Sequence, residues 1–182
     1  FFSLGIQALA QYLPKLLNIK KKKSLRADAY EQEAIKKLIL LDTENHSFVS
    51  KPASEVLASD AVMLAYIGDA VYSMYIRQRV VEMSISKVQI LHTLVTEFIC
   101  AKSQSKVLEQ LESMFTEDEQ TIARRARNSN VNVPKSSSVR EYRNSTAFEA
   151  VLGFLYETGQ QDRLNELMKA AYSITLRGLS HG

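Results

Sequence analysis

The feature that most constrains this chain is a run of sixteen residues, Ala61 to Ile76, in which Asp69 is the only charged side chain. A helix that is apolar on all sides is normally buried. A carboxylate inside such a helix must be paired, coordinated to a cation or protonated, because burying an isolated charge is very costly. Gly68 stands beside this acid and lets another backbone come close. The run therefore predicts a central helix whose acid needs a partner.

A second apolar run, from Ala147 to Tyr156, repeats this pattern with Glu149 as its only charge and Gly153 one helical turn later. Two apolar helices that each carry one acid and a nearby glycine are expected to pack together with their acids facing each other. Facing carboxylates repel unless a cation lies between them. Magnesium is the natural candidate, since it binds through one or two carboxylates and keeps several waters.

Each acid also has a purely local explanation. Asp69 could cap a helix that restarts after Gly68. Glu149 follows Thr146 at the spacing of a capping box and could bond back to the end of its own helix. Both explanations stay open for each acid taken alone. The two acids together, next to a basic stretch, favour a metal site beside a phosphate-binding surface, which is the arrangement that phosphodiester hydrolysis requires.

The charge of the chain is concentrated in two places. Residues 1–52 hold nine Lys and Arg against five Asp and Glu, much of the excess in the run Lys20 to Lys23. Residues 124–143 hold six Lys and Arg against Glu141 alone, although residues 53–182 as a whole carry a net charge of −1. A local basic stretch on an acidic body indicates a contact with a polyanion. A solvated loop without a partner is the competing interpretation.

Several kinds of site are excluded by composition. One cysteine, Cys100, rules out an internal disulfide framework and a cysteine-based zinc cluster. Three widely spaced histidines rule out an HExxH-type site, and neither standard glycine-rich phosphate loop is present. The apolar residues near the start of the chain are too few and too often interrupted to predict a membrane-spanning helix. Cys100 itself is expected to be a small buried side chain in a long helix.

The pattern along the chain predicts an all-α fold, because Pro and Gly are rare and no period-two strand pattern is convincing. We expect a basic N-terminal extension over residues 1–52, a catalytic domain over 53–178 and a tail over 179–182. Thr116 and Glu119 form a capping-box pattern, and Gly178 is placed as a helix C-cap. The helices are expected over residues 26–41, 54–79 (one or two), 86–114, 116–128, 145–157 and 162–177, with a loop over 129–141.

Two segments carry a resemblance to a known family. The run from Leu64 to Tyr72, LAYIGDAVY, resembles the signature helix of ribonuclease III, and Tyr142 to Tyr156, YRNSTAFEAVLGFLY, looks like the second acidic helix of that family. The likeness extends over about residues 55–178. It is closest to the Mini-III branch, which lacks a separate double-stranded-RNA-binding domain, and the segments Ala101–Ser105 and Arg124–Asn128 also look like elements of that branch.

The resemblance implies a helical endonuclease domain that forms a homodimer, with a cleft for duplex RNA and one magnesium-dependent site in each subunit. Members of the Mini-III branch trim precursors of large-subunit ribosomal RNA. Asp69 and Glu149 would be the catalytic and metal-binding acids. Tyr142, Ser145 and Thr146 would shape the rim of the site. The RNA-binding residues would be Arg124, Arg125, Arg127, Asn128, Lys135, Arg140 and Arg143.

The sequence also departs from the ribonuclease III pattern. Standard members carry four acids in these helices, whereas this chain has Val62, Ala65 and Thr146 at positions where further acids could be expected. Mini-III sequences look reduced in the same way, so an active enzyme is the favoured hypothesis. The alternative is a catalytically silent subunit of the same fold that binds RNA in an organellar ribosome or an assembly intermediate.

The place of the protein in the cell follows only indirectly. A bacterial cytoplasm is expected, or a chloroplast or mitochondrion if residues 1–52 are the remnant of an organellar precursor. That segment could equally be a docking segment, and an association with ribosomes fits either setting.

Overall fold

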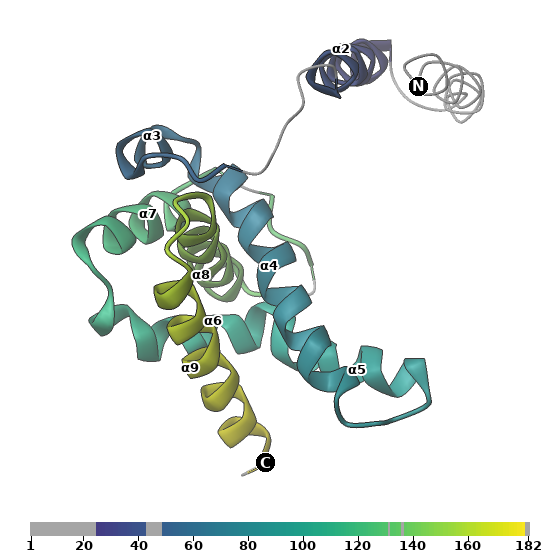
Figure 1. Cartoon of the computed structure of the whole chain (residues 1–182), viewed down its shortest axis with the longest axis vertical. Coiled ribbons are helices and arrows are strands. Elements are labelled where there is room, and N and C mark those ends of the chain that lie inside the picture. Colours follow the sequence, from purple (N-terminus) through teal and green to yellow (C-terminus); the bar gives the residue numbers. More distant parts are fainter. Residues whose placement is uncertain (1–24, 43–48, 131, 136, 181–182) are drawn as a thin grey trace. The chain divides into compact units, whose positions relative to one another are not determined.

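In the described part of the computed structural model, which covers residues 25–42 and 49–180 without 131 and 136, every regular element is a helix (Figure 1). The all-α expectation is therefore confirmed. The elements are α2 (Leu25–Asp42), α3 (Ala53–Ala58), α4 (Ala61–Val81), α5 (Val88–Ile99), α6 (Ala101–Leu111), the 3-10 turn η1 (Glu112–Met114), α7 (Glu117–Arg127), α8 (Val139–Glu157) and α9 (Gln161–Ser180).

Contacts divide the chain into two units, Phe1–Val49 and Ser50–Gly182. The helix predicted over residues 26–41 is confirmed as α2 in the first unit. The run Lys20 to Lys23 and the targeting or docking role expected of the first residues lie outside the described part of the chain. In that described part, no helix is both long and apolar enough to cross a bilayer.

Helix α8 is the centre of the second unit, with α4, α6, α7 and α9 packed around it (Figure 1). Every residue from Asn144 to Leu155 is buried except Glu149, which is half-buried. The most extensive contact of α8 is with α4, where Phe148 packs edge-on against Tyr72 at a ring-centroid distance of 5.3 Å. The apolar runs seen in the sequence are thus the two central helices of the core.

The helix predicted over residues 86–114 is wrong, because the chain breaks at Cys100 into α5 and α6. Cys100 has an extended backbone, with ψ at 150°, and its side chain is only partly buried at the junction. No Gly or Pro marks the break. It lets α5 pack on α4 while α6 packs on α8, so burial of two apolar faces in different directions overrides local helix propensity.

Two further boundaries differ from the sequence prediction. Helix α8 begins at Val139, whereas we expected a loop through residue 141 and a helix from Ser145. Ser138 and Glu141 form a capping box that starts the helix earlier, with the Ser138 hydroxyl accepting from the Glu141 N–H at 3.2 Å. Gly178 is not a C-cap, because α9 continues past it to Ser180.

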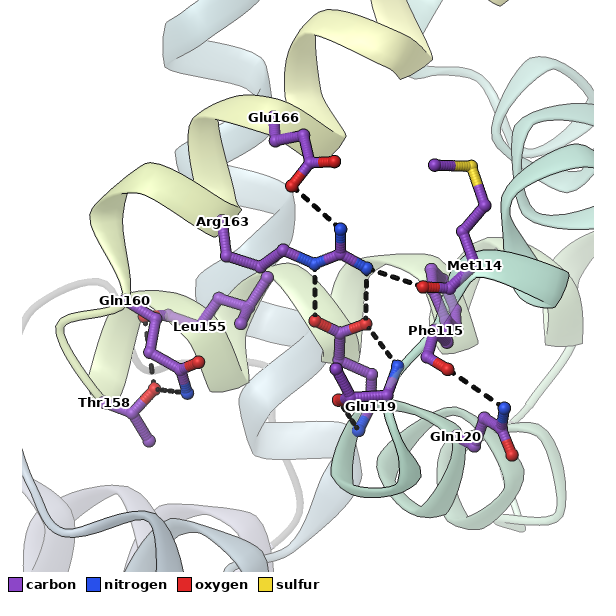
Figure 2. Close-up of polar contacts among 10 residues, drawn as sticks. Met114, Phe115, Glu119, Gln120, Leu155, Thr158, Gln160, Arg163 and Glu166 are labelled. Carbon is purple, nitrogen blue, oxygen red and sulfur yellow. Dashed lines mark hydrogen bonds and ion pairs between the residues drawn. The ribbon is translucent and has the colours of Figure 1, made fainter.

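The predicted capping box of Thr116 and Glu119 is confirmed, and it contains a buried ion pair (Figure 2). The Glu119 carboxylate accepts from the Thr116 N–H at 2.9 Å and from Arg163 Nε of α9, also at 2.9 Å. Arg163 donates in addition to the main-chain oxygen of Met114 at 2.7 Å and to Glu166 at 2.8 Å. The start of α7 and the first turn of α9 are joined by this network.

Helices α4 and α8 cross in direct backbone contact at their two glycines. A Cβ atom added at Gly68 would overlap the main-chain oxygen of Glu149 and lie 2.8 Å from the Gly153 nitrogen. A Cβ atom added at Gly153 would overlap the main-chain oxygen of Leu64. The obstructing atoms belong to helix backbones, which cannot move aside as a side chain can. Only glycine at both positions permits this crossing.

We predict that Gly68→Ala destabilises the fold by about 3 kcal/mol or more, at the upper end of overpacking penalties, because the added methyl group meets backbone. Urea unfolding followed by circular dichroism measures the change. Gly178→Ala is the matched control, since an added Cβ there meets nothing within 4 Å. The control is expected to stabilise α9 by about 0.5–1 kcal/mol. Equal effects of the two substitutions would contradict the close crossing.

We predict that Arg163→Leu lowers the free energy of unfolding by about 3 kcal/mol, because it leaves the Glu119 carboxylate buried without its charged partner. Arg140→Leu is the control: Arg140 pairs with Glu109 at 2.9 Å, but its side chain is 79% exposed. An exposed pair of this kind contributes less than about 1 kcal/mol. Thermal and urea unfolding of both variants would refute the prediction if the two losses were the same.

Candidate active site

Asp69 and Glu149 are brought together by the glycine crossing. Asp69 follows Gly68 in the middle of α4, and the main chain of Glu149 lies directly against Gly68. The charge of Asp69 is one of the causes that raise the pKa of Glu149, in agreement with two acids that lie near each other. The sequence expectation that the two apolar helices meet at their acids is therefore met. The catalytic and metal-binding roles of the two residues stay predictions.

Both acids are held where their charged forms are unfavourable. Burial, and then the nearby charge of Asp69, raise the pKa of Glu149 to about 8. Burial also raises the pKa of Asp69, and the positive charge of Arg77 opposes that rise. Desolvation and a like charge both disfavour a carboxylate. A cation between the two acids would reverse this effect by favouring their ionised forms.

The local explanations for the two acids do not hold. The N-cap of α4 is Asp60, whose carboxylate accepts from the Val62 N–H at 2.8 Å, so Asp69 lies in the helix interior. Glu149 lies in the interior of α8, far from the capping box at Ser138. Thr146 bonds back to the main-chain oxygen of Tyr142 at 2.9 Å instead of capping Glu149. Neither acid is explained by a helix end.

The donor set around the two acids is small. Among the described residues, no group of three or more His, Cys, Asp or Glu side chains is placed to hold a metal ion. A pair of carboxylates is still sufficient for magnesium, which takes one or two carboxylates and completes its shell with water and phosphate oxygens. The two acids therefore fit a hard divalent cation that is shared with a phosphate-bearing substrate.

The residues predicted to bind RNA fall into two groups. Arg124, Asn128, Lys135 and Arg143 have exposed side chains around the segment that links α7 to α8. The other three make contacts within the protein. Arg125 donates to the main-chain oxygens of Leu57 and Ser59, Arg127 pairs with Glu112 at 2.7 Å, and Arg140 pairs with Glu109 at 2.9 Å.

The contacts of Arg125 tie α7 to the end of α3, which gives this residue a structural role besides any contact with RNA. The four residues with exposed side chains could bind phosphates without losing a hydrogen bond or ion pair within the described part of the protein. All seven residues stay predictions as RNA ligands, with the exposed group the better placed.

The predicted rim residues lie in the second turn of α8. Tyr142 is half-buried, and its main-chain oxygen accepts from the hydroxyl groups of Ser145 and Thr146, each at 2.9 Å. Both hydroxyl-bearing residues are buried. Their donor hydrogens are satisfied by the helix itself, so they can act in the site only as acceptors.

Sequence reasoning missed Gln104 on α6. This side chain is fully buried and approaches Glu149 closely enough to lower the pKa of that acid. The approach falls short of a hydrogen bond, because neither the nitrogen nor the oxygen of the Gln104 amide has a partner among the described residues. The segment Ala101–Ser105 had drawn attention only through family resemblance. Its polar composition is typical of a helix surface.

Comparisons with known proteins identify a family for this chain. A family model described as a ribonuclease III domain matches residues 62–160, which include both acids. The chain is 36% identical over 132 residues to the Mini-ribonuclease 3 of Thermoanaerobacter sp. (strain X514), covering 72% of this chain and 92% of that protein. It is 40% identical over 116 residues to the Mini-ribonuclease 3 of Symbiobacterium thermophilum, covering 63% of this chain and 89% of that protein.

A solved structure also has a similar fold. The crystal structure of a protein from Fusobacterium nucleatum superposes with a TM-score of 0.58 and 28% sequence identity, covering 60% of this chain and 90% of that chain.

We predict that the metal-free protein loses stability as the pH rises from about 5 to 8. Folded Glu149 has a pKa of about 8, whereas its ordinary value is 4.5. In this range the folded state binds a proton that the unfolded state has released, so each pH unit costs up to about 1.4 kcal/mol. Urea unfolding in a chelator at several pH values measures the slope. Glu149→Gln should make it clearly shallower, and an unchanged slope in that variant would show that Glu149 is not the responsible group.

Proposed function

The chain belongs to the ribonuclease III family and is an endoribonuclease of that type, and from this premise we propose that it cleaves double-stranded RNA in a magnesium-dependent reaction at Asp69 and Glu149. The observation that carries the proposal is the convergence of these two acids at the glycine crossing of α4 and α8. The catalytically silent subunit is not favoured, because such a protein would have no need to keep both acids in this costly position.

The two acids would hold the metal at the crossing of α4 and α8. When bound, the ion supplies charge neutralisation on the phosphate and activates water for hydrolysis of the phosphodiester bond. Asp69 is exposed on α4 and can meet a substrate directly. Glu149 is half-buried in α8, and its neighbours on both sides along the helix are buried. One acid therefore faces the RNA, while the other anchors the ion to the protein.

The exposed side chains of Arg124, Lys135 and Arg143 are proposed to contact the RNA backbone. Arg124 lies in the last turn of α7, Lys135 on the segment that follows α7, and Arg143 in α8, the helix that carries Glu149. Phosphate contacts of this kind position a duplex and make binding steeply dependent on salt. Duplex RNA is recognised mainly through its shape, backbone and 2′-hydroxyl groups. Cleavage is therefore expected to show a weak sequence preference.

A precursor of large-subunit ribosomal RNA is proposed as the natural substrate. The support is the resemblance to the Mini-III branch and the similarity to proteins named Mini-ribonuclease 3. The proposed setting is the bacterial cytoplasm or an organelle, where that precursor and assembling ribosomes occur together.

We propose further that the protein is a homodimer that associates through α4. Met63, Tyr66 and Met74 lie on this helix with exposed fractions of 63%, 81% and 59%. They are spaced by three and eight residues, which places them along one side of the helix. Tyr66 and Met74, together with Ile67 and Ala70, line an apolar groove that is completed by α9 and by the end of α8. A contiguous exposed apolar surface of this kind marks an interface.

We predict that Asp69→Asn and Glu149→Gln each lower the rate of magnesium-dependent cleavage of duplex RNA at least about a hundredfold, because each keeps the shape of the side chain and removes a charge needed to hold the ion. Gel electrophoresis of an end-labelled duplex measures the rate. Glu82→Gln, an exposed change at the end of α4, is the control and should leave the rate unchanged. Native rates in both site variants would eliminate the catalytic assignment.

We predict that Tyr66→Glu weakens the dimer by about thirtyfold or more, the effect of losing a central interface residue worth 2 kcal/mol. Sedimentation velocity over a range of protein concentrations measures the equilibrium. Val139→Glu, at an exposed apolar residue of α8, should leave the dimer intact. A monomeric wild-type protein would contradict the homodimer, and a dimeric Tyr66→Glu protein would contradict the interface.

A further inference from the structure

Gln104 is an unusual core residue because its amide is buried without a hydrogen bond. The side chain has no exposed surface, and neither its nitrogen nor its oxygen atom has a hydrogen-bond partner among the described residues. Buried polar groups are nearly always satisfied, since an unmade hydrogen bond carries the full desolvation penalty. The other buried residues of the same helix are apolar, apart from Ser105, whose hydroxyl accepts a hydrogen bond from Asn144. A side chain that only filled space would be expected to be apolar as well.

The contacts between α6 and α8 show what faces Gln104. Arg140 pairs with Glu109 at 2.9 Å, and one turn later Asn144 donates to the Ser105 hydroxyl at 3.0 Å. Residue numbers rise along α8 as they fall along α6, so the two helices run antiparallel. The next turn of α8 beyond Asn144 carries Glu149, and the residue that precedes Ser105 on α6 is Gln104. In this register Gln104 lies level with Ser145, one helical turn from Glu149. Side chains lean toward the N-terminus of their own helix, so in this antiparallel pair the two long side chains lean toward each other.

The electrostatics of the site agree with this register. The Gln104 amide lowers the pKa of Glu149, against the effect of burial, and therefore lies close to this acid although the two form no hydrogen bond. Only the NH₂ of the Gln104 amide, and not its carbonyl oxygen, can bond to a carboxylate, because an ionised carboxylate is acceptor-only. The Glu149 carboxylate is therefore an acceptor close to the unpartnered amide nitrogen of Gln104.

We propose that Gln104 is a positioning residue that donates its side-chain N–H to the Glu149 carboxylate and thereby orients this acid toward Asp69. The inference rests on the proposed function, in which Glu149 holds a divalent ion. With one carboxylate oxygen occupied by Gln104, the other is directed to the ion. Carboxylate ligands are commonly fixed in this way by outer hydrogen bonds, and loss of such a bond weakens metal affinity or activity by about 10–100-fold.

The test uses Gln104→Met, which keeps the length of the side chain and removes the nitrogen and the oxygen of the amide. Binding of Mn²⁺ to the protein without RNA is measured by titration calorimetry, and the melting temperature is followed by circular dichroism. We expect metal affinity to fall about 10–100-fold while the melting temperature stays equal or rises, because an unsatisfied polar group has been replaced by an apolar one. Raising the ion concentration should recover cleavage, with the KM for RNA unchanged.

Gln110→Met is the matched control, since Gln110 is an exposed glutamine of the same helix. It should change neither metal affinity nor cleavage. If Gln104→Met fails to fold, Gln104→Leu provides a second apolar replacement for the same measurements.

The outcomes separate the two levels of the hypothesis. A wild-type protein that binds Mn²⁺ and a folded Gln104→Met variant that binds it within twofold would overturn the role of Gln104 alone. A fall in affinity that merely follows a loss of folded protein would overturn it too. A wild-type protein that neither binds Mn²⁺ nor cleaves duplex RNA would contradict the proposed function itself, and the role of Gln104 with it.

Discussion

The close crossing of α4 and α8 is the constraint on which the rest of the structure depends. The backbones touch at Gly68 and Gly153, where any side chain would overlap a main-chain atom of the other helix. Burial of two apolar helices provides the driving force, in proportion to the area removed from water. The contact also places the main chain of Glu149 against Gly68, the residue that precedes Asp69. The same crossing therefore determines both the packing of the core and the position of the two acids. Desolvation at this position raises the pKa of both carboxyl groups.

Much of this arrangement was predictable, because burial leaves a strong mark on sequence. A single acid and a nearby glycine in each of two apolar runs identified both the central helices and their meeting point. The break at Cys100 was not predictable, since no Gly or Pro interrupts the pattern there and the direction of each half is decided by packing. The early start of α8 had a readable signal in Ser138 and Glu141, which the surrounding polar residues concealed.

Polar side chains were harder to place than apolar ones. The sequence could count the cations between residues 124 and 143, but only the fold shows that Arg125, Arg127 and Arg140 are engaged within the protein. Gln104 shows the opposite case. In an amphipathic helix a glutamine is normally a surface residue, yet Gln104 is fully buried. Long-range contacts, which local patterns do not encode, decide both cases.

The most direct measurement is anomalous diffraction from crystals of the protein soaked in Mn²⁺, a substitute for magnesium that can be located without ambiguity. We expect a peak at the crossing of α4 and α8, within coordination distance of carboxylate oxygens from both Asp69 and Glu149. A peak that involves neither acid would contradict the central claim. So would two carboxyl groups that point apart, each bonded to its own helix in the presence of the ion.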